Sequence, residues 1–140
     1  GLGTYTQKEM ASLLGTTTSG TSGAQICNTL NSLLSKTSDT RRFQRVTIST
    51  AALETSVRSS LRNDFPLTLN VKEMPNYTSG SGHFIAVKGY YFNTSTDFKT
   101  ITICDPHPTY SGTYTYTLEE METAVESSNG YYNRLDASTV

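Results

Sequence analysis

The spacing of apolar residues changes once along this chain of 140 residues, close to Pro66. Before that proline, apolar residues recur at every third or fourth position, the spacing of one face of an α-helix. After it they recur at every second position, the spacing of one face of a β-strand. A single domain is expected at this length, and helices that precede most strands are typical of the α+β class. We therefore predict one α+β domain over residues 1–140, with N-terminal helices, a mostly antiparallel sheet and a C-terminal helix.

Three helices are predicted in the first half of the chain from their end signals and apolar stripes. Thr6 and Glu9 form a capping box at the first helix start, and Gly15 follows as a C-terminal stop. Thr21 or Ser22 caps the next helix. The predicted elements are helices from Thr6 to Gly15, from Ser22 to Leu34 and from Ala52 to Asn63, and a weak strand from Arg41 to Ile48.

Alternating apolar residues and a second capping box define the other half. Strands are predicted at residues 67–71, 83–91, 100–104 and 113–117. Thr117 and Glu120 repeat the capping-box pattern and open the final helix. The segment Asn76–Gly82, rich in serine and glycine, is predicted to be a mobile loop that closes as a lid over a cleft.

The charge balance excludes two function classes. The chain has 11 basic and 12 acidic side chains and a formal net charge of -1, so it lacks the one-sided field by which proteins bind nucleic acid or an anionic membrane surface. No apolar run approaches the ~20 residues needed to cross a bilayer. Serine and threonine make up about three residues in ten, and a surface rich in hydroxyl groups is common among exported bacterial proteins. We therefore expect a secreted protein with no nucleic-acid or membrane partner.

A histidine and an aspartate occupy matching ends of two neighbouring predicted strands. His83 begins the strand at 83–91, and Asp105 follows the strand at 100–104. Hairpin pairing places the start of the first beside the end of the second. The Asp105 carboxylate then accepts a hydrogen bond from one imidazole nitrogen and leaves the other to act as a base, at the edge of the sheet because Pro106 turns the chain away. The structural alternative is a strand-capping histidine followed by a turn-forming Asp-Pro pair.

The most specific motifs of the chain are Gly-His-Phe-Ile-Ala-Val-Lys-Gly-Tyr at residues 82–90 and the strand that ends in Asp105-Pro106. With the capped helix that follows the tyrosine-rich strand, they resemble the C-terminal two thirds of papain-like cysteine peptidases. Within that family they resemble the bacteriocin-processing, double-glycine-leader branch and its secreted relatives. The two N-terminal helices resemble those that follow the nucleophile helix in that family. The resemblance implies that His83 is the general base and that Asp105 orients it.

The resemblance also implies groups beyond these residues. Papain-like peptidases carry a nucleophilic cysteine at the start of a central helix, preceded by a glutamine that helps to bind the oxyanion. We expect that helix on a segment before Gly1, so the Cys-His-Asp triad is completed from outside residues 1–140. Three arrangements are open: a processed chain that retains the cleaved N-terminal peptide, a fragment of a longer chain, or a relative that has lost catalysis. The apolar groove that a missing helix exposes favours the first.

Neither cysteine of the chain is expected to be the nucleophile. Cys27 lies inside the second predicted helix, about one turn or more after its cap, whereas reactive thiols favour the helix start. We predict a half-buried structural thiol. Cys104 points to the opposite strand face from Asp105 and is predicted to be a core residue. The sequence leaves open whether the two thiols pair.

A metal site is a competing interpretation of the same residues. His83, Cys104, Asp105 and His107 offer ligands, but the compact, repeated ligand spacing of zinc sites does not occur in the sequence. We therefore expect no metal and no cofactor. Gly82 and His107 are expected to contact the substrate.

The leading prediction is a cysteine-type peptidase that acts on a peptide or protein substrate. The alternative is an inactive peptidase-like domain that binds peptides, because the groove and the sheet edge survive the loss of a nucleophile. Acyl transfer of the transglutaminase type, with the same order of Cys, His and Asp, is a third interpretation.

Overall fold

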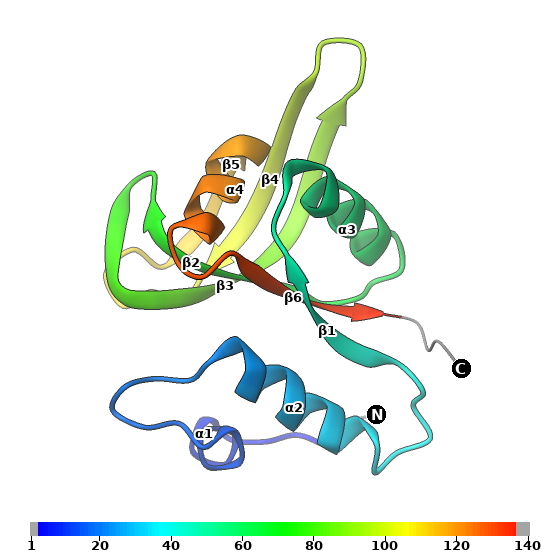
Figure 1. Cartoon of the computed structure of the whole chain (residues 1–140), viewed down its shortest axis with the longest axis vertical. Helices are drawn as coiled ribbons and strands as arrows, with labels where there is room; N and C mark the ends of the chain where they lie inside the picture. The colour runs from blue at the N-terminus through cyan, green and yellow to red at the C-terminus, as the bar shows by residue number, and fades with distance from the viewer. Residues whose placement is uncertain (1–2, 137–140) are drawn as a thin grey trace.

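The computed structural model describes residues 3–136, which contain four helices and a six-stranded antiparallel sheet (Figure 1). The elements are, in chain order, α1 (Gln7–Leu14), α2 (Gly23–Leu34), β1 (Arg42–Thr47), α3 (Thr50–Arg62), β2 (Leu67–Met74), β3 (Tyr77–Asn93), β4 (Phe98–Asp105), β5 (Gly112–Thr117), α4 (Leu118–Glu126) and β6 (Tyr131–Asp136). The strands lie in the order β1-β6-β2-β3-β4-β5. The predicted α+β class is confirmed.

A strand, and not the predicted C-terminal helix, is the last element of the described chain. β6 follows α4 and lies between β1 and β2, with Leu135 opposite Phe43 and Tyr132 opposite Leu69. Half of its residues are polar, so its own sequence is a weak strand signal. Pairing on both sides satisfies its backbone N–H and C=O groups and buries Tyr132 almost completely. Tertiary pairing therefore decides this element.

The ends of α1, α2 and α4 follow the predicted signals, whereas α3 begins at Thr50 after a Ser49 cap, two residues before the predicted start at Ala52. Thr6 and Glu9 form the capping box of α1, and Gly15 ends the helix with a φ of 65°. Ser22, and not Thr21, caps α2. The capping box that opens α4 is also present. No helix within residues 3–136 has both the length and the apolar character needed to cross a membrane.

The main core lies between the sheet and a layer formed by α3 and α4 (Figure 1). Leu53 and Val57 of α3 and Met121 and Val125 of α4 are fully buried there. The strand residues in the same cluster include Leu69, Val71, Ile85, Ile101 and Ile103. Each fully buried side chain of this size contributes roughly 1.5–3 kcal/mol through apolar burial. This layer is therefore the rigid scaffold of the fold.

The helix α2 packs on the opposite face of the sheet. In β6, Tyr132 points toward α3, where its hydroxyl donates to the carbonyl oxygen of Ala52. The next residue, Asn133, points the other way, and its Oδ1 accepts a hydrogen bond from the Cys27 thiol of α2 at 3.1 Å. Figure 1 accordingly shows α1 and α2 below the sheet and α3 and α4 above it.

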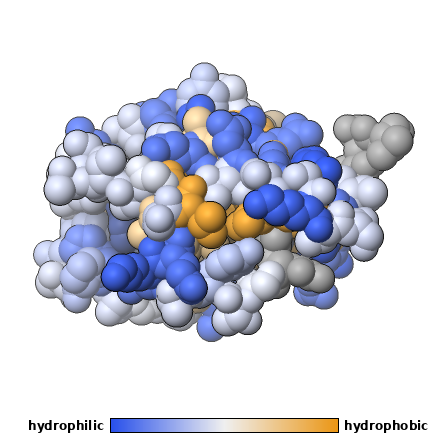
Figure 2. Space-filling view, turned by 90° about the horizontal axis from the view of Figure 1, so that it is seen from below, coloured by the Kyte–Doolittle hydropathy of each residue, from blue (hydrophilic) through white to orange (hydrophobic). Residues whose placement is uncertain are grey.

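The helix α1 is the least buried helix. None of its residues is buried, and Leu13 is 44% exposed. It is joined to α2 by side chains that donate to its last carbonyl groups, Thr29 to Leu13 and Gln25 to Leu14. Figure 2, which views the molecule from below, shows apolar side chains at the surface on this side. The apolar stripe of α1 is thus only partly covered by residues 3–136.

The prediction of a mobile loop at Asn76–Gly82 is wrong for most of that segment, because β3 begins at Tyr77. Thr78 pairs with β2, and the next pair joins His83 to Val71. These two pairs are five residues apart in β3 but only two apart in β2. The serine- and glycine-rich stretch is therefore a long bulge within a hairpin. These residue types disfavour strands, but the pairing on either side of the bulge holds them in place.

Candidate active site

His83 lies directly after the bulge of β3, where the strand rejoins β2 opposite Val71. Gly82 precedes it with a φ of 97°, a conformation that residues with a side chain rarely adopt. The sharp backbone turn at Gly82 and the regular pairing after it together direct the imidazole. The side chain of His83 is 17% exposed, so the ring remains accessible from solvent.

Asp105 is the last residue of β4 and shares a sheet face with Ile103. Its side chain is 0% exposed, so the prediction of a carboxylate at the open edge of the sheet is wrong. Pro106 does end the strand, but the chain then folds back, and the ring of His107 packs on Tyr77 with 4.6 Å between ring centroids. The carboxylate is thus fully buried, with Tyr77, His83 and the backbone of His107 as its hydrogen-bond partners.

The structure brings the side chains of His83 and Asp105 together, with 2.6 Å between Nε2 and Oδ1. The hydroxyl of Tyr77 donates to Oδ2 at 2.5 Å, and the backbone N–H of His107 donates to Oδ1 at 2.8 Å. Burial alone would raise the pKa of Asp105, but the hydrogen bonds from Tyr77, His83 and His107 outweigh it and hold that pKa below its ordinary value. Asp105 is therefore ionised at neutral pH.

This contact determines which nitrogen of His83 can act as a base. An ionised carboxylate only accepts hydrogen bonds, so Nε2, which faces Asp105, carries the proton. The other nitrogen, Nδ1, makes no hydrogen bond with residues 3–136 and has a free lone pair in the neutral ring. The pair therefore presents Nδ1 as the nitrogen that takes up a proton.

A hollow of about 610 Å³ opens beside His83, between the α1–α2 loop, the start of β3 and the turn after α4. Its lining consists mainly of hydroxyl and amide side chains, and within the described chain it includes no carboxylate, lysine or arginine. Gly82 is part of the lining. A Cβ added there would lie 3.4 Å from Ser128 Oγ and 3.5 Å from Asn70 Oδ1. The absent side chain therefore keeps the hollow open next to the imidazole.

His107 lies beside the pair but outside the lining of this hollow. Its Nδ1 accepts hydrogen bonds from the backbone N–H groups of Thr109 and Tyr110, at 3.1 and 3.3 Å. Its ring stands 5.4 Å from that of His83, edge to face. These contacts give His107 a role in shaping the loop after Asp105, and its contact with a substrate stays a prediction.

Cys27 is a buried thiol of α2, 5% exposed. Burial raises its pKa, and the positive charge of Arg45 only partly opposes that rise. Its Sγ donates to Asn133 and has no hydrogen bond to His83. A thiol with a raised pKa and a structural partner is a poor nucleophile at neutral pH, in line with the structural role predicted for it.

Cys104 is not the core residue that the sequence predicts. It does point away from Asp105, but the main core lies on the Asp105 face, and Cys104 is half-buried on the other face with Thr113 Oγ1 at 4.0 Å. Both cysteines of the chain are free thiols. No group of three or more His, Cys, Asp and Glu side chains within residues 3–136 is arranged to hold a metal ion.

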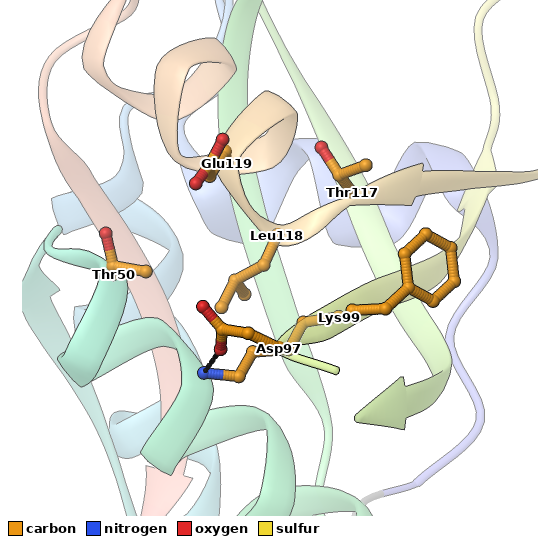
Figure 3. A pocket seen from close by; sticks show the side chains of 7 residues that line it. Thr50, Asp97, Lys99, Thr117, Leu118 and Glu119 are labelled. Atoms are coloured by element: carbon orange, nitrogen blue, oxygen red, sulfur yellow. Dashed lines mark ion pairs between the residues drawn. The ribbon is translucent and has the colours of Figure 1, made fainter. Parts of the chain in front are cut away.

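A smaller hollow of about 170 Å³ lies between the starts of α3, β4 and α4 (Figure 3). Lys99 Nζ is held there by Asp97 and by Glu54, at 2.9 Å from each. Thr50 of α3 also donates a hydrogen bond to Glu122 of α4. These contacts join three elements and pair the Lys99 ammonium with two carboxylates, and the His-Asp pair is not part of the lining. We assign no chemistry to this hollow.

Tyr77 is the residue of the site that the sequence analysis missed. It lies within the segment predicted to be a loop, 28 positions before the aspartate that it contacts. It is 8% exposed and belongs to the main core cluster. Tyr77 could have been found only by recognising that the residues on both sides of the Ser/Gly stretch belong to one strand of a hairpin. Nothing in the local sequence pattern marks that hairpin.

Comparison with known proteins gives one match. The model of the Peptidase_C39 like family matches residues 3–139. The match covers nearly the whole chain, including both motif segments that carry His83 and Asp105. No curated protein and no solved structure matches the chain.

Proposed function

The chain belongs to the Peptidase_C39 like family, and we propose that it hydrolyses peptide bonds with a Cys-His-Asp triad. His83 is the general base and later the general acid, and Asp105 orients it. The observation that carries this proposal is the buried 2.6 Å contact between His83 Nε2 and Asp105 Oδ1, which leaves Nδ1 available beside an open hollow. Peptides or proteins are the substrates.

In the proposed reaction, Nδ1 of His83 takes the proton of a cysteine thiol, and the thiolate attacks the scissile carbonyl carbon. The resulting tetrahedral oxyanion collapses as the imidazolium gives its proton to the leaving amine, which departs and leaves an acyl-thioester. His83 next takes a proton from water, whose hydroxide attacks the thioester, and returns it to the cysteine sulfur. Asp105 remains ionised and stabilises each imidazolium, as in other catalytic triads.

We place the nucleophilic cysteine, and a glutamine that helps to bind the oxyanion, on a segment before residue 1. The chemistry of the two thiols in this chain supports that placement, because Cys27 is bound to Asn133 and Cys104 lies on the far face of β4. The apolar surface on α1 supports it as well, since Leu13 and its neighbours are left partly exposed. In this proposal the cysteine lies at the N-terminus of a helix packed there, where thiolates are stabilised.

We further propose that the substrate backbone lies in the polar hollow. Gly82 allows an extended chain to approach the imidazole, because it lines the hollow next to His83 without a side chain. His107 contacts the substrate from the loop after Asp105. Secretion is part of the same proposal and is supported by the hydroxyl-rich composition; recovery of the protein from culture medium that lacks cytoplasmic markers tests it.

Labelling of the complete gene product with an epoxide directed at papain-like thiols tests the function. The wild type is expected to be labelled at a cysteine before residue 1 and to cleave peptides. The variant His83→Ala is expected to lose at least about 100-fold in both rates, the usual contribution of a general base. Arg62→Ala, at the exposed end of α3, is the control and is expected to keep both the labelling rate and the cleavage rate.

An unchanged labelling rate in His83→Ala contradicts the role given to this residue. If the gene encodes no cysteine before residue 1 but the purified domain binds peptides in the hollow, the inactive peptide-binding alternative replaces the peptidase. Intact mass and N-terminal sequencing of the purified protein show directly whether a cleaved peptide remains associated.

A further inference from the structure

The carboxylate of Asp105 is held by both of its oxygens. Oδ1 accepts from His83 Nε2 and from the backbone N–H of His107, at 2.6 and 2.8 Å. Oδ2 accepts from the hydroxyl of Tyr77 at 2.5 Å, and no other residue of the described chain donates to it. A carboxylate held by one oxygen can rotate about its Cβ–Cγ bond, whereas donors on both oxygens prevent that rotation.

We propose that Tyr77 is a positioning residue of the active site: its hydroxyl fixes the Asp105 carboxylate in the orientation that accepts from His83. This inference rests on the proposed function, in which Asp105 must keep His83 Nδ1 directed toward the attacking thiol. The tyrosine acts through the aspartate and needs no contact with the substrate.

Tyr77 is itself well anchored. It is 8% exposed, its ring is stacked on Tyr110 with 4.6 Å between centroids and 5° between planes, and the ring of His107 lies at 4.6 Å. Burial raises the pKa of Tyr77, and the hydrogen bond to Asp105 raises it further. The hydroxyl therefore stays protonated and donates throughout the pH range in which a peptidase of this kind works.

The hydrogen bond from Tyr77 also affects where the proton in the His-Asp pair lies. A donor on Oδ2 makes the carboxylate less basic, so a proton shared between His83 and Asp105 stays on the imidazole. The other titratable groups near the carboxylate are the ring of His107 in the adjoining loop and Tyr116 on β5, whose pKa is raised by burial, by Tyr114 and by Asp105. The two tyrosine hydroxyls of β5 donate elsewhere, Tyr114 to the carbonyl oxygen of Ser111 and Tyr116 to Asn76.

The first test measures the titration of the Asp105 carboxyl carbon by NMR in this chain, without any need for activity. Tyr77→Phe keeps the stacked ring and removes only the donor, so the Asp105 pKa is expected to rise by about one pH unit. Tyr116→Phe is the matched control, because it removes a hydroxyl that donates to Asn76 instead. Superimposable Asp105 titrations in Tyr77→Phe and the wild type overturn the inference.

The second test measures kcat/KM of the complete gene product. Tyr77→Phe alone is expected to lower it about tenfold, in proportion to one hydrogen bond to a charged group. In the background Asp105→Asn the same change is expected to lower it less than twofold, because the group through which Tyr77 acts is already gone. An equal loss in both backgrounds shows that Tyr77 acts through packing and overturns the proposal.

The two tests separate this inference from the proposed function. A complete gene product with no peptidase activity removes the proposed function, while the Asp105 titration still decides whether Tyr77 holds the carboxylate. If Tyr77→Phe does not fold, the variant Asp105→Asn tests the same pair from the side of the tyrosine. Without the carboxylate, the pKa of Tyr77, followed by the NMR resonance of its Cζ, is expected to fall. An unchanged Tyr77 titration contradicts the proposed contact between Tyr77 and Asp105.

Discussion

The two faces of the sheet are packed to very different degrees. On one face, α3 and α4 each bury four residues. On the other, α2 buries four residues but α1, which packs beside it, buries none. The main core cluster accordingly draws its helical members from α3 and α4. Local opening requires less free energy where fewer apolar contacts are broken, so α1 and its following loop are expected to open well before the sheet.

The candidate site lies between these two regions. His83, Asp105 and Tyr77 belong to the sheet on which α3 and α4 pack. The opposite wall of the hollow includes Ser19 and Thr21, from the loop after the lightly packed α1. The chemical groups are thus held rigidly while one wall of the hollow can adjust, an arrangement that suits an enzyme that must admit an extended substrate.

The largest expected difference comes from removing the same side chain from each region. Leu53→Ala in α3 is expected to lower the free energy of unfolding by about 3 kcal/mol, because Leu53 is fully buried and leaves a cavity. Leu13→Ala in α1 is expected to lower it by under about 0.5 kcal/mol, because that side chain is 44% exposed. Urea denaturation measures both. Equal losses would mean that α1 is as firmly packed as α3.

Two glycines with positive φ compare the bulge with the α1–α2 loop. Gly82 has a φ of 97° and Gly20 one of 92°, so alanine introduces similar backbone strain at both, about 1–2 kcal/mol. At Gly82 the new Cβ lies in ordinary van der Waals contact with Ser128 and Asn70, and nothing lies within 4 Å of one at Gly20. Gly82→Ala and Gly20→Ala are therefore expected to destabilise the protein by similar amounts, about 1–2 kcal/mol each. Thermal unfolding of the two variants gives the comparison, and a loss at one site more than twice that at the other would contradict it.

Helix caps extend the comparison to a smaller effect. Thr117→Ala removes the N-cap of α4, part of the main core, and is expected to lower the free energy of global unfolding by about 1 kcal/mol. Thr6→Ala removes the equivalent cap of α1 and is expected to leave global unfolding almost unchanged while speeding hydrogen exchange in α1. If Thr6→Ala lowers global stability as much, α1 unfolds with the core and not before it.

The smallest effect concerns pH. The pKa of Asp105 is held below its ordinary value in the folded protein, so the folded state binds a proton here less readily than the unfolded state. The stability from this group is present above the unfolded pKa, about 3.9, and is lost as pH falls toward the folded pKa. Asp105→Asn is therefore expected to flatten the acid side of the stability curve below about pH 4. Unfolding measured from pH 5 downward checks this, and an unaltered slope would contradict it.

Local signals predicted most of the elements. Capping boxes at Thr6 and Thr117 and the stop at Gly15 place helix ends correctly because they act within a few residues of the backbone groups that they satisfy. The alternation that predicts β2 and β4 is local in the same sense. The failures are β6 and the first part of β3, whose own sequences are poor strand formers and whose pairing partners lie far along the chain.

The candidate site shows the same division. The residues His83 and Asp105 were identifiable from their places at the ends of strands that form one hairpin. The burial of Asp105, the outward face of Cys104 and the donor Tyr77 were not, because each depends on which face the helices cover and on how the loop after Asp105 folds back. The catalytic roles themselves stay predictions until the complete gene product is assayed.

By itself the sequence determined the class of the fold, most of the helix ends, and the meeting of the His83 imidazole with the Asp105 carboxylate, since periodicity, caps and hairpins are properties of short segments. The tertiary structure alone decided that the carboxylate is buried, that a tyrosine holds its second oxygen and that Nδ1 of the imidazole is the free nitrogen. The physical reason is that burial and hydrogen-bond partners depend on packing between segments distant in the chain, which local patterns do not encode.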